Sequence, residues 1–252
     1  MKAMILAAGL GTRLRPLTNE RPKALVEVAG RTLLEITLSR LRTVGIREVI
    51  VNVHHFADMV TDYLKENSNF GMRIEISCEE VLLDTGGGLK KVAWFFQESP
   101  ADREAPFILH NVDVISTIDL RRMVDFHRDR QALATIAVQA RETSRYLLFD
   151  ENNELCGRRA GQAGKPGAPE MARPARQVEA LAFSGVHVIS PRFLSEVTEE
   201  EAFSIINAYQ RLVARGEKIS AFRADQYYWR DLGKPESVVQ AELDVQQQIL
   251  IL

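Results

Sequence analysis

Apolar positions along the chain follow alternating strand and helix patterns. The short apolar runs at 3–8 and 49–53 are typical of buried strands, whereas 33–44 carries apolar residues at helical spacing. Strands that alternate with helices in this way predict right-handed β-α-β crossovers. We therefore expect an α/β fold with a mostly parallel mixed sheet and helices on both faces. The later elements of this series are expected at 59–64 (helix), 73–77 (strand), 89–96 (helix), 107–109 (strand) and 120–127 (helix).

The pattern changes after residue 133. Further strands are expected at 134–139, 147–150, 181–189 and 219–223, some of them antiparallel. Amphipathic helices are expected at 203–215 and 235–248. The intervening stretch 157–176 is rich in Gly, Pro, Ala and Arg and has no hydrophobic period. It predicts a mobile loop, and a lid or an excursion without function both remain open.

The stretch after the first strand reads L-A-A-G-L-G-T-R-L-R-P-L-T and is followed by R-P-K-A-L. Gly9 and Gly11 allow a ligand to approach the backbone closely, and backbone N–H groups in such loops bind anions. Arg13 and Lys23 add positive charge suited to phosphate oxygens, while Arg15 is expected to support the loop. We interpret this stretch as a phosphate cradle. It contains neither a Walker loop nor the third glycine of the dinucleotide fingerprint, so NAD binding is disfavoured.

Composition and charge narrow the class further. The chain has 252 residues and a formal net charge of -2, which argues against a dedicated nucleic-acid surface. No apolar run is long enough to span a membrane, and the N-terminus predicts a core strand rather than a signal peptide. Cys78 and Cys156 form no metal-spaced or redox pair, so a cytoplasmic location is expected.

The cradle closely resembles the signature of sugar-1-phosphate nucleotidylyltransferases. The resemblance extends through D-T-G-G-G at 84–88, Asn111-Val112-Asp113 and W-R-D-L-G at 229–233, and it covers nearly the whole chain. The chain is most similar to the short types that act on mannose, heptose or N-acetylmuramate 1-phosphate. This resemblance implies a three-layer Rossmann-like nucleotidyltransferase fold. It also implies one domain over 1–252, with a nucleotide-binding part at 1–132 and a sugar-phosphate-binding part at 133–252.

The reaction implied by the resemblance joins a nucleoside triphosphate to a sugar 1-phosphate and releases pyrophosphate. Two polyanions must meet, which suits a hard divalent cation, normally Mg²⁺. Asp113 and Asp231 are the candidate metal ligands, and a turn or N-cap role is the alternative for each. Arg13, Lys23 and Asp113 are the candidate catalytic residues. No general base is needed, because a phosphate monoester is already largely dianionic near neutral pH.

Two further groups of residues are candidates for substrate binding. The candidates for nucleotide binding are Leu6, Ala7, Ala8, Gly9, Gly11, Thr12, Arg13, Glu79, Gly86 and Gly87. The candidates for sugar-phosphate binding are Lys23, Asn111, Glu179, Gly185 and Asn207. Ordinary surface roles for Glu179 and Asn207, and a flexible helix start for 86–88, are the alternatives.

Substrate identity is less constrained. Many relatives carry a base-reading glutamine where this chain has Cys78-Glu79-Glu80, and a carboxylate there could accept hydrogen bonds from guanine. The expected NTP is GTP or UTP rather than CTP or dTTP. Val112 replaces a usual family glycine. A cytidylyltransferase acting on phosphocholine or a similar phosphate and a non-catalytic nucleotide-sugar-binding regulatory subunit are the rival functions. The protein is expected to be a monomer or a homo-oligomer.

Overall fold

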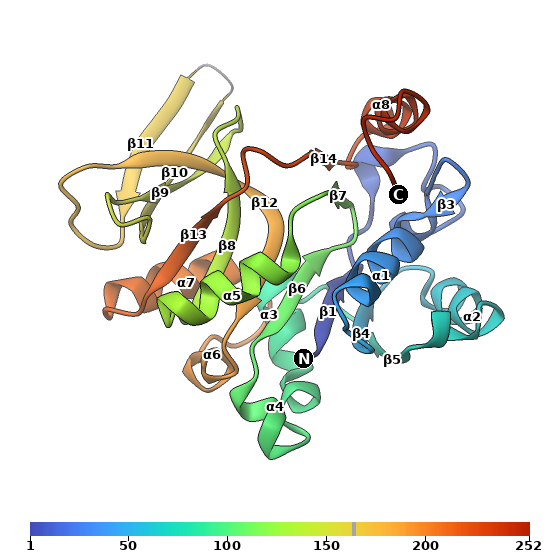
Figure 1. Cartoon of the computed structure of the whole chain (residues 1–252), viewed down its shortest axis with the longest axis horizontal. Coiled ribbons are helices and arrows are strands. Elements are labelled where there is room, and N and C mark those ends of the chain that lie inside the picture. The colour runs from blue at the N-terminus through green and yellow to red at the C-terminus, as the bar shows by residue number, and fades with distance from the viewer. Residues whose placement is uncertain (163–164) are drawn as a thin grey trace. The chain divides into compact units, whose positions relative to one another are not determined.

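The computed structural model describes residues 1–162 and 165–252 and divides into two compact units. The first unit comprises Met1–Leu83, Leu109–Ile118 and Tyr227–Leu252, and the second comprises Asp84–Ile108 and Asp119–Gln226 (Figure 1). Each unit is therefore assembled from segments that are distant in sequence. The division of the chain at residue 132 stays a prediction.

The sheet of the first unit has the strand order β6-β1-β4-β5, in which β1, β4 and β5 pair in parallel. Helix α1 connects β1 to β4 and helix α2 connects β4 to β5, as the apolar spacing predicts. Strand β4 is buried along nearly its whole length, so its side chains are part of the core of the unit. Its elements are β1 (Ala3–Leu6), β2 (Glu27–Val28), β3 (Arg31–Thr32), α1 (Leu33–Thr43), β4 (Glu48–Val53), α2 (Ala57–Glu66), β5 (Arg73–Cys78), β7 (Val114–Ser116), β14 (Trp229–Asp231) and α8 (Pro235–Gln246).

The second unit is built on a mixed sheet in which β11, β10, β9 and β12 follow one another, β8 pairs with β12, and β13 pairs with β8. Helix α5 packs against β8, β12 and β13, while α7 packs against α3 and β10. Strand β6 (Phe107–Asn111) begins in this unit and ends in the first. The other elements are α3 (Asp84–Lys91), α4 (Pro100–Glu104), α5 (Leu120–Arg130), β8 (Ala134–Gln139), β9 (Arg145–Phe149), β10 (Leu155–Gln162), β11 (Lys165–Met171), β12 (Glu179–Ile189), α6 (Arg192–Glu196), α7 (Ile205–Ala214) and β13 (Ile219–Arg223).

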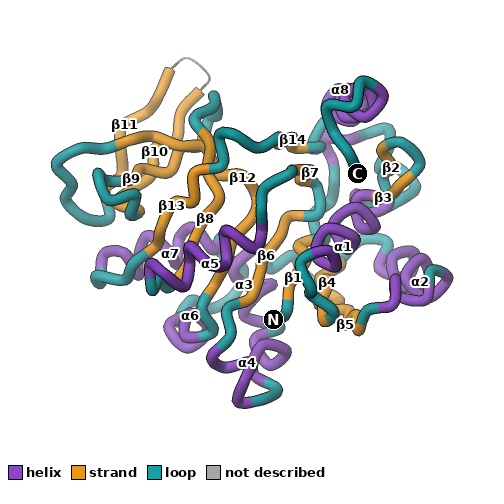
Figure 2. Tube along the Cα trace, viewed as in Figure 1, coloured by secondary structure: helices purple, strands orange, loops and turns teal. Residues whose placement is uncertain are grey.

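The predicted loop at 157–176 is wrong for the residues that the structure describes. Most of this stretch forms the antiparallel pair β10–β11, which Figure 2 shows as strands, and residues 163–164 lie outside the described part. The hydrogen bonds of a ladder come from the backbone, so a stretch without a hydrophobic period can still pair when it lies at a sheet edge. The lack of a hydrophobic period at 157–176 therefore did not exclude strands there.

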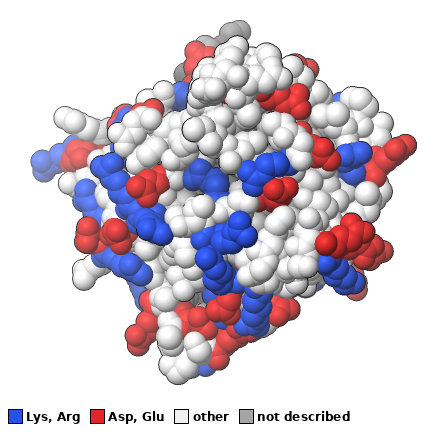
Figure 3. Space-filling model, turned by 45° about the vertical axis from the view of Figure 1, so that its right-hand side comes forward, with Lys and Arg blue, Asp and Glu red and all other residues white. Residues whose placement is uncertain are grey.

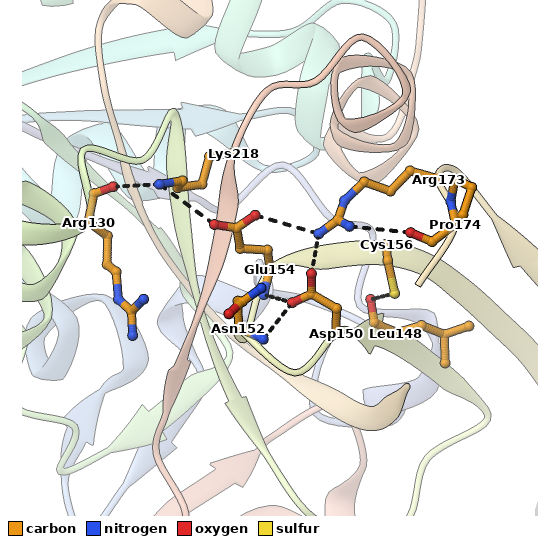
Figure 4. A network of polar contacts seen from close by, with 9 residues as sticks. All are labelled: Arg130, Leu148, Asp150, Asn152, Glu154, Cys156, Arg173, Pro174 and Lys218. Atoms are coloured by element: carbon orange, nitrogen blue, oxygen red, sulfur yellow. Dashed lines mark hydrogen bonds and ion pairs between the residues drawn. The ribbon is translucent and has the colours of Figure 1, made fainter. Parts of the chain in front are cut away.

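A polar network fixes the turn that precedes β10 (Figure 4). The Arg173 guanidinium lies 2.6 Å from Asp150 Oδ2 and 3.5 Å from Glu154 Oε2, and Lys218 Nζ lies 3.6 Å from Glu154 Oε1. Asp150 Oδ1 also accepts hydrogen bonds from the backbone N–H groups of Asn152 and Glu154. The β9–β10 turn is thus held by charge-assisted contacts to later segments of the same unit.

Charges of both signs are interspersed over the face drawn in Figure 3, in keeping with the near-zero formal net charge. Within the described residues, no helix is both long enough and apolar enough to cross a bilayer.

Candidate active site

The cradle leaves strand β1 at Leu6 and turns at Gly11. Gly11 has a φ of 63°, and its carbonyl accepts hydrogen bonds from Thr18 Oγ1 at 2.8 Å and from the N–H of Leu14 at 2.9 Å. The left-handed conformation favours glycine at this position, and a Cβ here would also lie 3.0 Å from Thr18 Cγ2, a tight contact. The loop buries Leu14 and leaves Arg13 exposed.

Lys23 and Asp113 come together in the first unit although 90 positions separate them. Pro22 is extended, and a short helical turn follows over Lys23–Leu25. Lys23 Nζ forms an ion pair with Asp113 Oδ2, and each side chain is 13% exposed. Lys23, near the end of the cradle, therefore contacts the aspartate in the turn between β6 and β7.

Asp231 lies next to Asp113 across a small antiparallel ladder. Strand β14 pairs with β7 so that Asp231 lies opposite Val114, and the N–H of Leu232 donates to the Asp113 carbonyl at 2.8 Å. Asp231 Oδ1 accepts from the N–H of Gly233 at 2.8 Å, and no hydrogen bond from a described residue reaches Oδ2. Helix α8 has Lys234 as its N-cap residue, so Asp231 does not cap that helix, but the contact of its Oδ1 with the Gly233 N–H is the turn role named as the alternative.

Gly233 brings Arg13 into the same cluster. A Cβ built on Gly233 would lie 2.6 Å from Asp231 Oδ1 and 2.8 Å from Arg13 Nη2. The Arg13 guanidinium and the Asp231 carboxylate therefore border the same glycine. The sequence offered one signal for this position, the glycine that closes the W-R-D-L-G string.

The Gly233→Ala variant is expected to lower kcat/KM for nucleotidyl transfer by about tenfold or more, because the new methyl group displaces Asp231 or Arg13. Steady-state kinetics on the folded variant measures this effect. Glu236→Ala, in the first turn of α8, is the control and is expected to retain wild-type kinetics. Equal kcat/KM for Gly233→Ala and the wild type would contradict the expectation that a methyl group here displaces Asp231 or Arg13.

The carboxylates fit one particular kind of cation site. Among the described residues, no group of three or more His, Cys, Asp and Glu side chains could hold a metal. Asp113, in the turn just before β7, and Asp231, in the paired strand β14, both carry hard carboxylate oxygens. Mg²⁺ commonly binds through one or two carboxylates and completes its shell with water and substrate phosphates. This donor set therefore suits a cation that binds together with a phosphate substrate.

Residues 110–112 lie at the end of β6, directly before Asp113. Asn111 Oδ1 is buried and has no hydrogen-bond partner in the described part of the chain, so one acceptor close to Asp113 is unsatisfied. Val112 is buried, and its N–H donates to the Leu6 carbonyl at 3.1 Å. The valine side chain that replaces the usual glycine thus packs inside the unit.

Two buried histidines are neutral near pH 7. Burial, together with the positive charge of Arg40, lowers the pKa of His110 to about 4. Burial and the charge of Arg128 likewise lower the pKa of His127 to about 4. His127 is held between Thr135 Oγ1 at 2.9 Å and Ser190 Oγ at 3.0 Å, a packing role that needs no charge.

These histidines predict a loss of stability in mild acid. An unfolded histidine has a pKa near 6.5, so the unfolded chain binds protons first as the pH falls. The contribution is complete above about pH 6.5 and is lost between about pH 6.5 and 4, by roughly 3 kcal/mol per histidine. Denaturant unfolding of the wild type and His127→Gln across this range measures it. An identical loss in both proteins would contradict the assignment for His127.

Glu79 is buried, and both of its carboxylate oxygens have partners in the first unit. Asn52 Nδ2 donates to Oε1 at 2.7 Å, and the N–H of Leu83 donates to Oε2 at 3.0 Å. The sequence analysis missed Asn52, although an asparagine inside the apolar run V-I-V-N-V is a visible signal. The predicted contact between Glu79 and a nucleobase stays untested.

The glycines at 86–88 lie in the first half of helix α3 of the second unit, and the predicted contacts of Gly86 and Gly87 with the nucleotide stay predictions. The N–H groups of Gly86 and Gly87 donate to the Phe203 carbonyl at 2.9 and 3.3 Å. A Cβ on Gly86 would lie 2.1 Å from the Phe203 ring. Close packing against Phe203 is therefore one reason why this position is glycine.

The remaining sugar candidates also lie in the second unit. Glu179 forms a bidentate pair with Arg223 Nη1 at 2.7 and 2.6 Å, and Asn207 Oδ1 accepts from Arg158 Nη1 at 2.7 Å. Gly185 has a φ of 77° at an irregularity in the pairing of β12 with β8. Each of these residues has a structural role, and their sugar contacts stay predictions.

Residues 2–248 match a family model described as nucleotidyl transferase. The chain belongs to the nucleotidyl transferase family. This nucleotidyl transferase is 34% identical to the N-acetylmuramate alpha-1-phosphate uridylyltransferase of Caulobacter vibrioides, over 95% of each chain. It is 30% identical to the mannose-1-phosphate guanylyltransferase of Mycobacterium tuberculosis, over 96% of this chain and 64% of that protein. The predicted family membership is confirmed.

Solved structures agree on the fold. HddC from Yersinia pseudotuberculosis, complexed with GMP-PN, matches with a TM-score of 0.74 and 21% identity over 97% of this chain and 99% of that one. A putative glucose-1-phosphate thymidylyltransferase from Bacillus anthracis, complexed with a sucrose, matches with a TM-score of 0.79 and 18% identity over 100% and 97%. The predicted Rossmann-like nucleotidyltransferase fold is confirmed.

Proposed function

We propose that the protein transfers a nucleotidyl group from an NTP to a sugar 1-phosphate and releases pyrophosphate. The observation that carries this proposal is the cluster in the first unit, where Lys23 pairs with Asp113, and Arg13 and Asp231 border Gly233. Arg13 and Lys23 therefore each lie beside a carboxylate at the β7–β14 pair. Such a cluster suits two phosphate-bearing substrates and a cation. The relatives that carry sugar-1-phosphate names support the same reaction.

The basic side chains act on the phosphates. Arg13 binds the β- and γ-phosphates through its planar guanidinium and stabilises the departing pyrophosphate. Lys23 neutralises charge between the α-phosphate and the attacking sugar phosphate as a compact ammonium. The attacking oxygen needs no base, because the phosphate monoester is already largely dianionic.

Magnesium is the cofactor we propose for this cluster. Asp113 and Asp231 would hold the ion, which would neutralise phosphate charge when bound. Backbone groups of the cradle would bind the nucleoside end of the NTP, and Asn111 would contact the sugar phosphate through its unpartnered oxygen. The backbone residues assigned to the nucleoside are Leu6, Ala7, Ala8, Gly9, Gly11 and Thr12.

GTP or UTP is the proposed nucleotide. The curated relatives include a uridylyltransferase and a guanylyltransferase, and the solved neighbour from Yersinia pseudotuberculosis holds GMP-PN. The proposed acceptors for a first panel are N-acetylmuramate 1-phosphate and mannose 1-phosphate, because the relatives' names contain them.

Pyrophosphate release with Mg²⁺ tests the proposal. GTP, UTP, CTP, ATP and dTTP are each combined with sugar 1-phosphates and with phosphocholine. Release that requires one NTP and one sugar 1-phosphate supports nucleotidyl transfer to sugars. Release with phosphocholine alone would move the protein to the cytidylyltransferase function. Tight binding of a nucleotide sugar without turnover would favour a regulatory subunit.

A further inference from the structure

Three hydrogen bonds link the ends of three strands in the first unit. The N–H of Ala7, just after β1, donates to Asn52 Oδ1 at 2.8 Å, and Asn52 Nδ2 donates to Glu79 Oε1 at 2.7 Å. The N–H of Leu83 donates to Glu79 Oε2 at 3.0 Å. Asn52 and Glu79 are 3% and 4% exposed, so water competes little for these contacts.

In this series of hydrogen bonds, the direction of every bond is fixed. Both of its ends are backbone N–H groups, which can only donate. The Asn52 amide must therefore turn its oxygen to Ala7 and its NH₂ group to residue 79. Residue 79 then faces a donor on each side and must accept twice. An ionised carboxylate does so, whereas the single amide oxygen of a glutamine leaves its NH₂ facing one of the two donors.

The backbone of Glu79 is fixed as firmly as its side chain. Its N–H donates to the Val53 carbonyl at 2.8 Å, and its carbonyl lies 2.6 Å from His54 Nδ1. The carboxylate therefore cannot swing toward a ligand without breaking contacts at both oxygens. What it can do is set the positions of Ala7, at the start of the cradle, and Leu83, which directly precedes α3.

We infer that Glu79 and Asn52 are positioning residues that set the nucleotide-binding backbone, rather than groups that read the base with the carboxylate. This inference rests on the proposed function, because it takes Ala7 and its neighbours as the backbone that binds the nucleoside. It also gives a physical reason why this chain carries glutamate rather than glutamine at 79. The carboxylate completes an internal hydrogen-bond chain.

A swap of the two side-chain types tests the inference. In Glu79→Gln, the Gln NH₂ group meets either Asn52 Nδ2 or the N–H of Leu83, so one hydrogen bond is lost. In Asn52→Asp, two carboxylates face each other. The double variant Asn52→Asp/Glu79→Gln restores every contact with the middle bond reversed. Asp at 52 then accepts from Ala7 and from the new Gln NH₂, and the Gln oxygen accepts from Leu83.

Kinetics gives the first readout. Each single variant is expected to raise KM for the NTP by about tenfold, the scale of one lost buried hydrogen bond, with KM for the sugar 1-phosphate nearly unchanged. The double variant is expected to return KM for the NTP to within about twofold of the wild type. Base reading by the carboxylate would instead leave the double variant as impaired as Glu79→Gln, and this result would overturn the inference. So would single variants with a wild-type KM.

Amide hydrogen exchange gives a second readout that does not depend on turnover. In the free protein, one of the two end amides is expected to lose protection by about tenfold in Glu79→Gln and to regain it in the double variant: Leu83 if the Gln NH₂ faces it, or Ala7 if the Gln NH₂ faces Asn52 and the Asn52 amide flips. Unchanged protection of both amides in Glu79→Gln would overturn the hydrogen-bond chain itself. A wild-type protein that protects Leu83 but turns over no NTP would instead count against the proposed function, so the two failures can be distinguished.

Discussion

Replacement of Asp113 by asparagine is expected to lower kcat/KM about a thousandfold, the scale seen when one group that stabilises transition-state charge is removed. Asparagine keeps the size of the side chain but removes the negative charge that pairs with Lys23. In the proposed reaction it also removes one of two carboxylate ligands for the cation. Steady-state pyrophosphate release measures the loss.

The control must separate a catalytic aspartate from a capping one. Asp119 is the N-cap of α5 and accepts a hydrogen bond from the N–H of Arg122 at 3.0 Å. Asparagine is nearly as good an N-cap, so Asp119→Asn is expected to keep wild-type activity. Circular dichroism and thermal unfolding check that both variants are folded. A fully active Asp113→Asn enzyme would contradict the role assigned to Asp113.

Replacement of Lys23 by methionine is expected to lower kcat/KM about a hundredfold, since a preorganised charge is lost from the site. Methionine has a similar length and can fill the same space, so packing changes little. Lys23 is only 13% exposed and pairs with Asp113, so its charge is held in the cluster and is weakly screened by solvent. Kinetics at saturating and limiting NTP would measure the effect.

Arg21 provides a control in the same loop. It is exposed and lies 4.0 Å from Glu27, a surface pair of small energetic value. Arg21→Gln is therefore expected to behave like the wild type. Equal losses in Lys23→Met and Arg21→Gln would indicate a general effect of loop charge and contradict a specific role for Lys23.

The periodic elements could be predicted from sequence because burial dictates them. The helix over 33–44 and the strand over 49–53 were expected from apolar spacing, and α1 and β4 lie there within a residue. The pair β10–β11 was missed because edge strands depend on backbone pairing rather than on an apolar pattern. Sequence patterns report burial well and backbone pairing poorly.

Some site residues could be predicted from the sequence and others could not. Arg13, Lys23, Asp113 and Asp231 were found from motif strings, and the structure brings them into one unit. Asn52 and Gly233 are visible in the sequence, but their roles depend on contacts between segments far apart in sequence, which no local pattern reports. Gly86 is a similar case, because its string is visible while its packing against Phe203 is not.

The proposed reaction transfers the nucleoside monophosphate unit, with its α-phosphate, to a sugar phosphate. The most direct measurement follows two radiolabelled samples of the active NTP, one labelled in the α-phosphate and one in the γ-phosphate, through a complete reaction with the sugar 1-phosphate. We expect the α-label in the nucleotide sugar and the γ-label in pyrophosphate. A γ-label found in orthophosphate or on the sugar phosphate would contradict it.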